Sequence, residues 1–238
     1  MQAIGIFGGT FDPIHYGHLR LAEEMADALS LREVRFIPTG QPPHRAAPHT
    51  SAAHRLEMVR RAIAGNLRFT LDDREVRATR ISYTVDTLTE LRSEMDAQQP
   101  LCLLLGADAF LGLSSWHEWR RLFDLAHIVV VRRPGTSLQH ALPEALEQEV
   151  APRWVQGNTL ATAAPARGAP PDVHALHGAR PLDGLGAAGT VSILEMTPLA
   201  ISASMIRNML TQQKSVRYLM PDTVCDYLQQ QQLYKPEK

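Results

Sequence analysis

Short apolar runs that alternate with helical patterns constrain the fold of this chain more than any other feature of its sequence. Two of the runs, "LCLLLG" at 101–106 and "HIVVVRR" at 127–133, are apolar over most of their length. Near-continuous apolar strands are typical of a parallel sheet that is covered on both faces. The sequence predicts strands at 3–7, 33–38, 68–73, 101–106, 127–133 and 190–196, and helices at 17–29, 54–64, 84–95, 202–210 and 222–231.

This order of elements predicts an α/β fold. Right-handed β–α–β crossovers build a doubly wound, mostly parallel, Rossmann-like sheet with helices on both faces, here followed by a C-terminal helical region. We expect one domain over 1–238, with a flexible insertion at 157–189, where Ala, Gly and Pro are frequent. Ligands of such sheets bind at the carboxyl ends of the strands, which here are 8–18, 39–45, 106–119 and 132–135.

Charge and apolar content exclude several classes of protein. The chain has 238 residues, a net charge of −1 and 45% apolar residues, so nothing attracts it generally to nucleic acid, and an anion site would be local. The start "MQAIGIFGG" lacks a secretory signal, and no apolar run approaches the ~20 residues of a membrane span. Cys102 and Cys225 suggest no disulfide framework. We expect a cytoplasmic protein without nucleic-acid or membrane partners, whose oligomeric state, monomer or homo-oligomer, stays open.

The stretch "GIFGGTFDPIHYGH" follows the first expected strand and predicts a phosphate site. Its Gly-Gly pair lets the backbone approach a ligand closely, and a helix that starts near Gly17 directs free N–H groups into the same space. The glycine order fits neither a dinucleotide loop nor a Walker loop. His15 and His18 lack the third ligand that a metal site needs, and can instead donate to phosphate oxygens. The alternative is that His15 only caps the helix and His18 packs.

Two motifs resemble the signatures of the HxGH nucleotidyltransferase superfamily. "GGTFDPIHYGH" resembles the first, and "ISASMIR" at 201–207 fits the second, I-S-x-[ST]-x-x-R. Ser202 is a good N-cap residue, and Ser204 has a free hydroxyl on the first turn of the expected helix. Arg207 lies one turn further, where its guanidinium can bind phosphate oxygens. The chain most resembles the bacterial nicotinate mononucleotide adenylyltransferases, and the match fades only within 136–189.

The resemblance implies that the chain transfers AMP from ATP to nicotinate mononucleotide, which gives nicotinate adenine dinucleotide and pyrophosphate in NAD biosynthesis. Mg²⁺ would be bound mainly through the ATP phosphates, without a set of protein ligands. The catalytic residues would be His15, His18 and Arg207. ATP would be bound by Gly8, Gly9, Thr10, Phe11, Gly17, Gly106, Asp108, Arg133, Ile201, Ser202 and Ser204. The mononucleotide would be bound by His44, Arg45, Tyr83, Thr84, Thr87, Trp116 and His117.

Several of these residues have a plain structural alternative. Polar neighbours in "SSWHEW" favour partial exposure and ring stacking for Trp116 and Trp119, although both could be core aromatics. Thr84 could be only a helix cap, and Arg132 with Arg133 could be a solvated pair rather than phosphate ligands. Arg45 stands where the family usually has Lys, and Ser204 where it often has Thr.

Rival functions stay open at this point. A related HxGH enzyme such as phosphopantetheine adenylyltransferase would share both motifs, but its substrate offers no pyridine ring to stack on Trp116. A fragment of a class I aminoacyl-tRNA synthetase would need a Lys-Met-Ser-Lys-Ser loop, which is absent. A non-catalytic nucleotide sensor would bind without releasing pyrophosphate. The preference between nicotinate and nicotinamide mononucleotide is not determined by the motifs.

Overall fold

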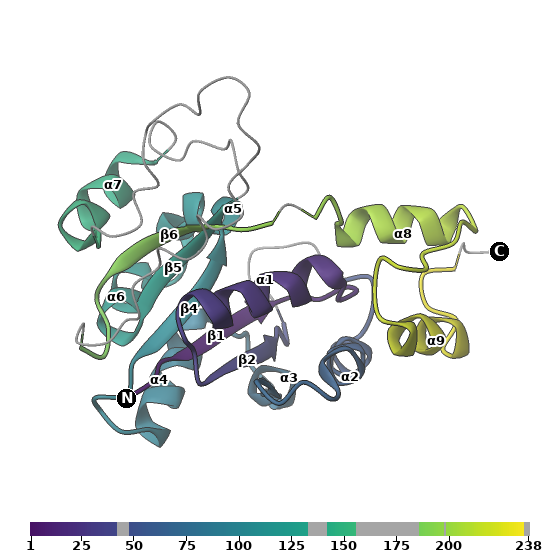
Figure 1. Ribbon diagram of the computed structural model, residues 1–238, viewed down its shortest axis with the longest axis horizontal. Helices are drawn as coiled ribbons and strands as arrows, with labels where there is room; N and C mark the ends of the chain where they lie inside the picture. Colours follow the sequence, from purple (N-terminus) through teal and green to yellow (C-terminus); the bar gives the residue numbers. More distant parts are fainter. Residues whose placement is uncertain (42–47, 133–141, 156–185, 198, 236–238) are drawn as a thin grey trace.

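A six-stranded parallel sheet forms the centre of the protein (Figure 1). The computed structural model describes residues 1–41, 48–132, 142–155, 186–197 and 199–235. The strand order is β3-β2-β1-β4-β5-β6, and every pairing between neighbours is parallel, which confirms the Rossmann-like prediction. The strands are β1 Ile4–Gly9, β2 Glu33–Pro38, β3 Phe69–Leu71, β4 Leu101–Gly106, β5 His127–Arg132 and β6 Val191–Glu195.

The helices include all five that the periodicity predicts and several short ones that it does not. The five are α1 Tyr16–Ala28, α2 Ala52–Ile63, α4 Thr84–Glu94, α8 Ala203–Thr211 and α9 Asp222–Gln230. Helices of one or two turns offer too few positions to show a period, so the sequence did not reveal them. These are α3 Arg74–Arg77, α5 Ala107–Leu111, α6 Leu122–Leu125 and α7 Glu144–Val150, with 3₁₀ turns at Leu113–Ser115, Trp119–Arg121 and Ala151–Arg153.

Helices cover both faces of the sheet, as the apolar strands require. Successive residues of a strand point to opposite faces, so Phe36 and Ile37 belong to different core clusters, as do Leu104 and Leu103. One cluster includes buried residues of α1, α2, α8 and α9, and the other includes buried residues of α4, α5, α6 and α7. Burial on both sides explains why these strands carry no polar alternation.

The order of the strands places a crevice at the carboxyl ends of β1 and β4. β1 pairs with β2 on one side and with β4 on the other, so the chain leaves the middle of the sheet in two directions. This reversal is the switch point at which open α/β sheets bind ligands. The loops that follow β1 and β4 therefore border one common space.

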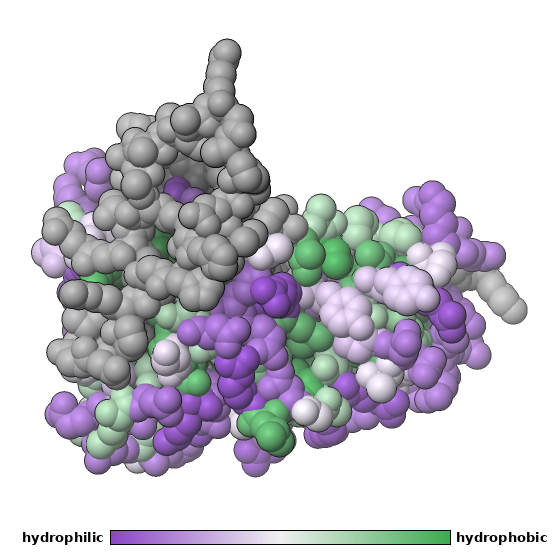
Figure 2. Space-filling model, in the orientation of Figure 1, coloured by the Kyte–Doolittle hydropathy of each residue, from purple (hydrophilic) through white to green (hydrophobic). Residues whose placement is uncertain are grey.

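The C-terminal helices extend the protein beyond these strand ends. Figure 1 shows α8 and α9 on the side toward which β1 points. Figure 2 shows apolar side chains gathered over α8 and over the segment that leads into it. Ile206 of α8 is fully buried, and Ile201, Met209 and Leu210 pack against the same core cluster. The C-terminal helical region is thus part of the main core.

The insertion expected at 157–189 lies outside the described residues, except for 186–189. Among the described helices, none has the length and apolar character needed to cross a membrane.

Candidate active site

The loop between β1 and α1 holds the two motif histidines against one another. His15 is the N-cap residue of α1, and its carbonyl accepts the N–H of His18 at 2.9 Å. In return, Nδ1 of His18 accepts the backbone N–H of His15 at 3.3 Å. The two imidazole rings stack, with centroids 3.8 Å apart. Local helix geometry therefore fixes the orientation of both rings.

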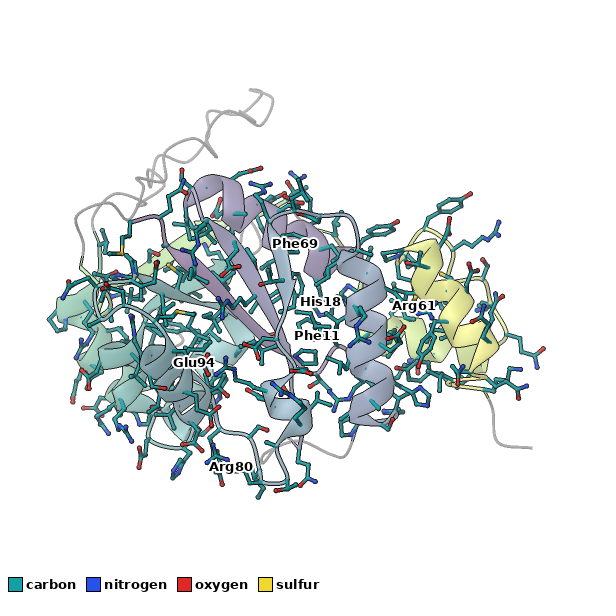
Figure 3. The ribbon with its side chains drawn as sticks, turned by 90° about the horizontal axis from the view of Figure 1, so that it is seen from below. Phe11, His18, Arg61, Phe69, Arg80 and Glu94 are labelled. Atoms are coloured by element: carbon teal, nitrogen blue, oxygen red, sulfur yellow. The ribbon has the colours of Figure 1, made fainter. Side chains whose placement is uncertain are left out.

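Both histidines are uncharged at neutral pH. Burial lowers the pKa of His15 to about 4. Burial also lowers the pKa of His18 well below its usual value, and repulsion from His15 adds to this. Because Nδ1 of neutral His18 is an acceptor, its proton lies on Nε2, which is left as a hydrogen-bond donor. Figure 3 shows His18 beside Phe11, whose ring meets the imidazole edge-to-face at 5.1 Å.

The second motif lies beside the first, although the two are almost 200 residues apart in sequence. Arg207 donates from Nη1 to the carbonyl oxygen of Asp12 at 2.6 Å. A Cβ atom on Gly17 would lie 2.9 Å from the His15 ring and 3.5 Å from the Ile201 carbonyl oxygen. Glycine is therefore the residue that fits between the histidine ring and the segment entering α8.

The start of α8 differs in one detail from the expectation. Ser202 is the N-cap residue, and its Oγ accepts the N–H of Met205 at 3.2 Å, as predicted. Ser204 was expected to have a free hydroxyl, but its Oγ lies 3.1 Å from Oγ of Ser202, so the two hydroxyls share a hydrogen bond. Both serines remain exposed at the helix N-terminus, where a phosphate could replace this contact.

A set of residues that the sequence did not reveal holds the motif loop in place. Arg55 of α2 is buried, with 1% of its surface exposed, and donates to the carbonyl oxygens of Thr10 at 2.9 Å and Gly40 at 3.0 Å. The Asp12 carboxylate accepts hydrogen bonds from the backbone N–H of His49 and from the hydroxyls of Thr50 and Tyr234. One signal existed for Arg55, which shares the buried face of α2 with Met58 and Val59. A charged residue on an apolar stripe needs buried partners.

The crevice between β1 and β4 contains a cavity that brings most of the other expected residues together. Its lining includes Gly8 and Gly9 at the end of β1, Thr10 directly after them, and Gly106 at the end of β4. The rings of Tyr83 and His117 lie with their centroids 4.4 Å apart and their planes tilted by 35°. The expected residues Tyr83, Thr84, Thr87, Trp116 and His117 all line the cavity, together with Thr39, Glu75 and Ser82, which the sequence did not single out.

The structure corrects three expectations. Trp119 is 7% exposed and packs in the core, so only Trp116 is available for stacking. Thr84 is the first residue of α4 rather than its cap, a position that Tyr83 occupies. Arg132 was expected to turn toward phosphate, but it donates to the Glu195 carboxylate at 2.6 Å.

Other expected residues lie apart from the cavity or beyond the described part of the chain. Asp108 is exposed on the first turn of α5 and does not line the cavity, although it follows Gly106 closely. Phe11 lies against His18, and Gly17 lies between the His15 ring and the carbonyl oxygen of Ile201. His44, Arg45 and Arg133 lie outside the described residues.

Metal ligands are absent from the described part of the site. Within the described ranges, no three His, Cys, Asp or Glu side chains are placed to hold an ion together. The Asp12 carboxylate, which lies closest to the histidine motif, already accepts three hydrogen bonds from protein groups. A divalent cation in this region would take most of its ligands from a bound phosphate chain and from water.

Comparison with known proteins identifies the family. The model of the cytidylyltransferase-like family matches residues 6–209. A probable nicotinate-nucleotide adenylyltransferase of Dechloromonas aromatica is 48% identical over 235 residues, which cover 98% of each chain. The chain belongs to the nicotinate-nucleotide adenylyltransferase family. It is therefore an enzyme of the nucleotidyltransferase class.

A second relative in the nicotinate-nucleotide adenylyltransferase family is similar in sequence over nearly its whole length. A relative from Pseudomonas aeruginosa is 43% identical over 234 residues, again with 98% of each chain covered. The relatives belong to this family and not to the class I aminoacyl-tRNA synthetases, which were the rival interpretation of the first motif.

Solved structures agree on the fold. Nicotinic acid mononucleotide adenylyltransferase of Plasmodium falciparum, in complex with NaAD, superimposes with a TM-score of 0.67 at 19% identity. The same protein in complex with APC gives a TM-score of 0.65 at 17% identity. In both cases 98% of each chain is covered. The described part of this chain therefore has the same fold as these solved structures.

Proposed function

We propose that the protein transfers the adenylyl group of ATP to nicotinate mononucleotide and releases pyrophosphate, a step of NAD biosynthesis. One observation carries the proposal beyond family membership. The segment Gly8–Thr10, at the end of β1, lines the cavity and leads directly into the loop that presents His15 and His18. A ring bound in the cavity would therefore have its phosphate beside the histidines. The proposed substrates are two small molecules that meet in the cytoplasm.

The proposed reaction needs alignment more than acid–base chemistry. A phosphate oxygen of the mononucleotide forms a bond to the α-phosphorus of ATP, and the bond from that phosphorus to the bridging oxygen breaks, so pyrophosphate leaves with the electron pair. The attacking phosphate is already ionised, so no general base is required. This agrees with two histidines whose lowered pKa values leave each ring uncharged, with a single proton, and only weakly basic at neutral pH.

Each part of the motif pair has a proposed role in this step. Nε2–H of His18 donates to the α-phosphate, where negative charge builds in the transition state. The ring of His15 holds His18 by stacking at 3.8 Å. Arg207, Ser202 and the N-terminus of α8 bind the β- and γ-phosphates. Mg²⁺, held through the ATP phosphates, would reduce the negative charge that opposes attack.

A substrate panel tests the proposed function. Pyrophosphate release is measured with ATP or CTP, paired with nicotinate mononucleotide, nicotinamide mononucleotide or phosphopantetheine. The expected result is release with ATP and a pyridine mononucleotide and none with phosphopantetheine. Release only with phosphopantetheine would assign the protein to a sister activity, and binding without any release would make it a sensor.

Substituting Arg207 is expected to weaken ATP binding. Arg207→Ala removes a guanidinium from the triphosphate site, so KM for ATP should rise by about 10-fold or more, as for loss of a charge-assisted hydrogen bond. Steady-state kinetics with varied ATP measure the change. Asn208→Ala, at the exposed neighbouring position of α8, is the matched control and should leave KM unchanged. An Arg207→Ala enzyme with unaltered ATP kinetics would remove this residue from the phosphate site.

Substituting Trp116 is expected to affect the other substrate. Stacking of a base on an aromatic side chain contributes about 1–3 kcal/mol, so Trp116→Ala should raise KM for the mononucleotide roughly 5- to 150-fold and leave KM for ATP nearly constant. Trp119→Phe is the comparison, because Trp119 lies in the core and should change thermal stability instead. Equal effects of Trp116→Ala on both substrates would contradict the stacking role.

A further inference from the structure

The cavity has two chemically different walls. Tyr83, Trp116 and His117 supply aromatic surface, and Glu75, Ser82 and Thr87 supply polar groups. The Oγ atom of Ser82 is buried and has no hydrogen-bond partner among the described residues. A flat ring that stacks on the aromatic residues would share the cavity with these polar groups, which would then surround its own polar substituent. In a pyridine mononucleotide that substituent is either a carboxylate or a carboxamide.

Glu75 is the ionisable residue among the polar residues that line the cavity. Thr87, which is buried on α4, donates from Oγ1 to Oε1 of Glu75 at 2.7 Å. The backbone of Glu75 is held as well, because a Cβ atom on Gly40 would lie only 2.0 Å from its carbonyl oxygen. Only glycine permits this approach between α3 and the segment after β2. The carboxyl group is therefore fixed in the wall rather than free to swing into solvent.

Charged neighbours of Glu75 partly cancel one another. Asp72 raises its pKa and Arg74 lowers it, and Arg74 is itself paired with Asp72 and Glu94. Arg55 of α2 also interacts electrostatically with Glu75, but its guanidinium donates hydrogen bonds to backbone carbonyl oxygens. The other ionisable side chains of the cavity, Tyr83 and His117, belong to the aromatic wall. Burial has the largest effect and raises the pKa of Glu75 to about 7.

We propose that Glu75 determines which pyridine mononucleotide the cavity accepts, because the charge of its carboxyl group meets the substituent of the bound ring. The inference rests on the proposed function and adds a specificity-determining residue to it. Protonated Glu75 tolerates a ring carboxylate and can donate a hydrogen bond to it. Ionised Glu75 repels a carboxylate, whereas a carboxamide N–H₂ can donate to it.

The selectivity of the enzyme should therefore depend on pH. The ratio of kcat/KM for nicotinate mononucleotide to kcat/KM for nicotinamide mononucleotide is expected to fall as pH rises from 6 to 8.5. The limit is about tenfold per pH unit above the pKa of Glu75, since one proton is involved. Both substrates carry the same phosphate, so its own titration cancels in the ratio. Glu75→Gln, which keeps the shape and cannot ionise, should hold the ratio at its low-pH level throughout.

Two comparisons separate Glu75 from its surroundings. Asp73→Asn removes an exposed carboxylate two residues away that pairs with Arg77, and it should leave the pH dependence as in the wild type. A pH dependence that persists in Glu75→Gln would overturn the proposal.

Calorimetry of the wild-type protein gives a second readout that does not depend on a variant. Nicotinate mononucleotide is titrated into the enzyme at pH 7.5 in two buffers of different ionisation enthalpy, and nicotinamide mononucleotide serves as the reference. Binding of the ring carboxylate should take up a fraction of a proton more than binding of the carboxamide, since the ligand charge raises the pKa of Glu75 further. Equal proton uptake for both ligands would overturn the role of Glu75. If pyrophosphate release occurs with neither mononucleotide, the proposed function itself fails.

Discussion

Replacing His18 with alanine is expected to lower kcat by about 100- to 1,000-fold, the usual effect of removing one donor from a developing anion. The proposed donor is Nε2–H, because Nδ1 of His18 accepts the backbone N–H of His15. The loss should be nearly constant from pH 6 to 9, since burial keeps His18 neutral through that range. KM values should change little, because the interaction is made mainly in the transition state.

Single-turnover measurement of pyrophosphate release tests this expectation, with circular dichroism to check the fold. His18→Gln is the informative comparison, since its side-chain N–H₂ can reach the position of Nε2 and should restore part of the lost rate. A His18→Ala enzyme within about threefold of the wild-type rate would exclude the proposed role. In that case His18 would serve to pack against His15 and Phe11.

Replacing Arg55 with alanine is expected to lower the free energy of unfolding by about 3 kcal/mol or more. The guanidinium links the segments that follow β1 and β2 through the carbonyl oxygens of Thr10 and Gly40, and each hydrogen bond from a charged donor contributes about 1.5–3 kcal/mol. The substitution also leaves a cavity, because the Arg55 side chain is 1% exposed. Arg55→Lys should restore little, since a single ammonium does not span both carbonyls as the planar fork does.

Urea denaturation measures the loss, and Arg60→Ala on the same helix is the control. The Arg60 side chain is 58% exposed and pairs with Glu57 at the surface, where such pairs contribute at most about 1 kcal/mol. A loss below about 1 kcal/mol for Arg55→Ala would show that water or neighbouring donors replace the guanidinium.

The fold could be predicted from the sequence because its strands are buried on both faces. The runs at 33–38 and 101–106 coincide with β2 and β4 to the residue, and the rules for β–α–β crossovers predicted the doubly wound, parallel arrangement. The short helices could not be predicted, because elements as brief as α3 and α6 show no period. Whether such a short segment becomes a helix depends on the apolar surface of the neighbouring strands that it can cover.

The site was predictable where its residues are neighbours in sequence. Each motif spans its own helix start, so the motifs and the family resemblance predicted the places of His15, His18 and Ser202 at these helix starts. Glu75 was missed because it stands in "LDDREVRATR", where one more charged residue indicates only a solvated surface. Its proximity to Thr87 is a property of the folded chain. The hydroxyl contact of Ser204 and the burial of Trp119 likewise depend on neighbours that a linear pattern does not specify.

The hydrogen bond between Tyr234 and Asp12 has a consequence for how the protein is made. It joins residues 222 positions apart, so the motif loop near the start of the chain is completed by a segment that the ribosome adds long after β6. All six strands can pair before this partner exists, since domains begin to fold during synthesis. A nascent chain can therefore hold its sheet while its motif loop still lacks one of its three side-chain and backbone donors to Asp12. The motif loop is in this sense completed after the sheet to which it is attached.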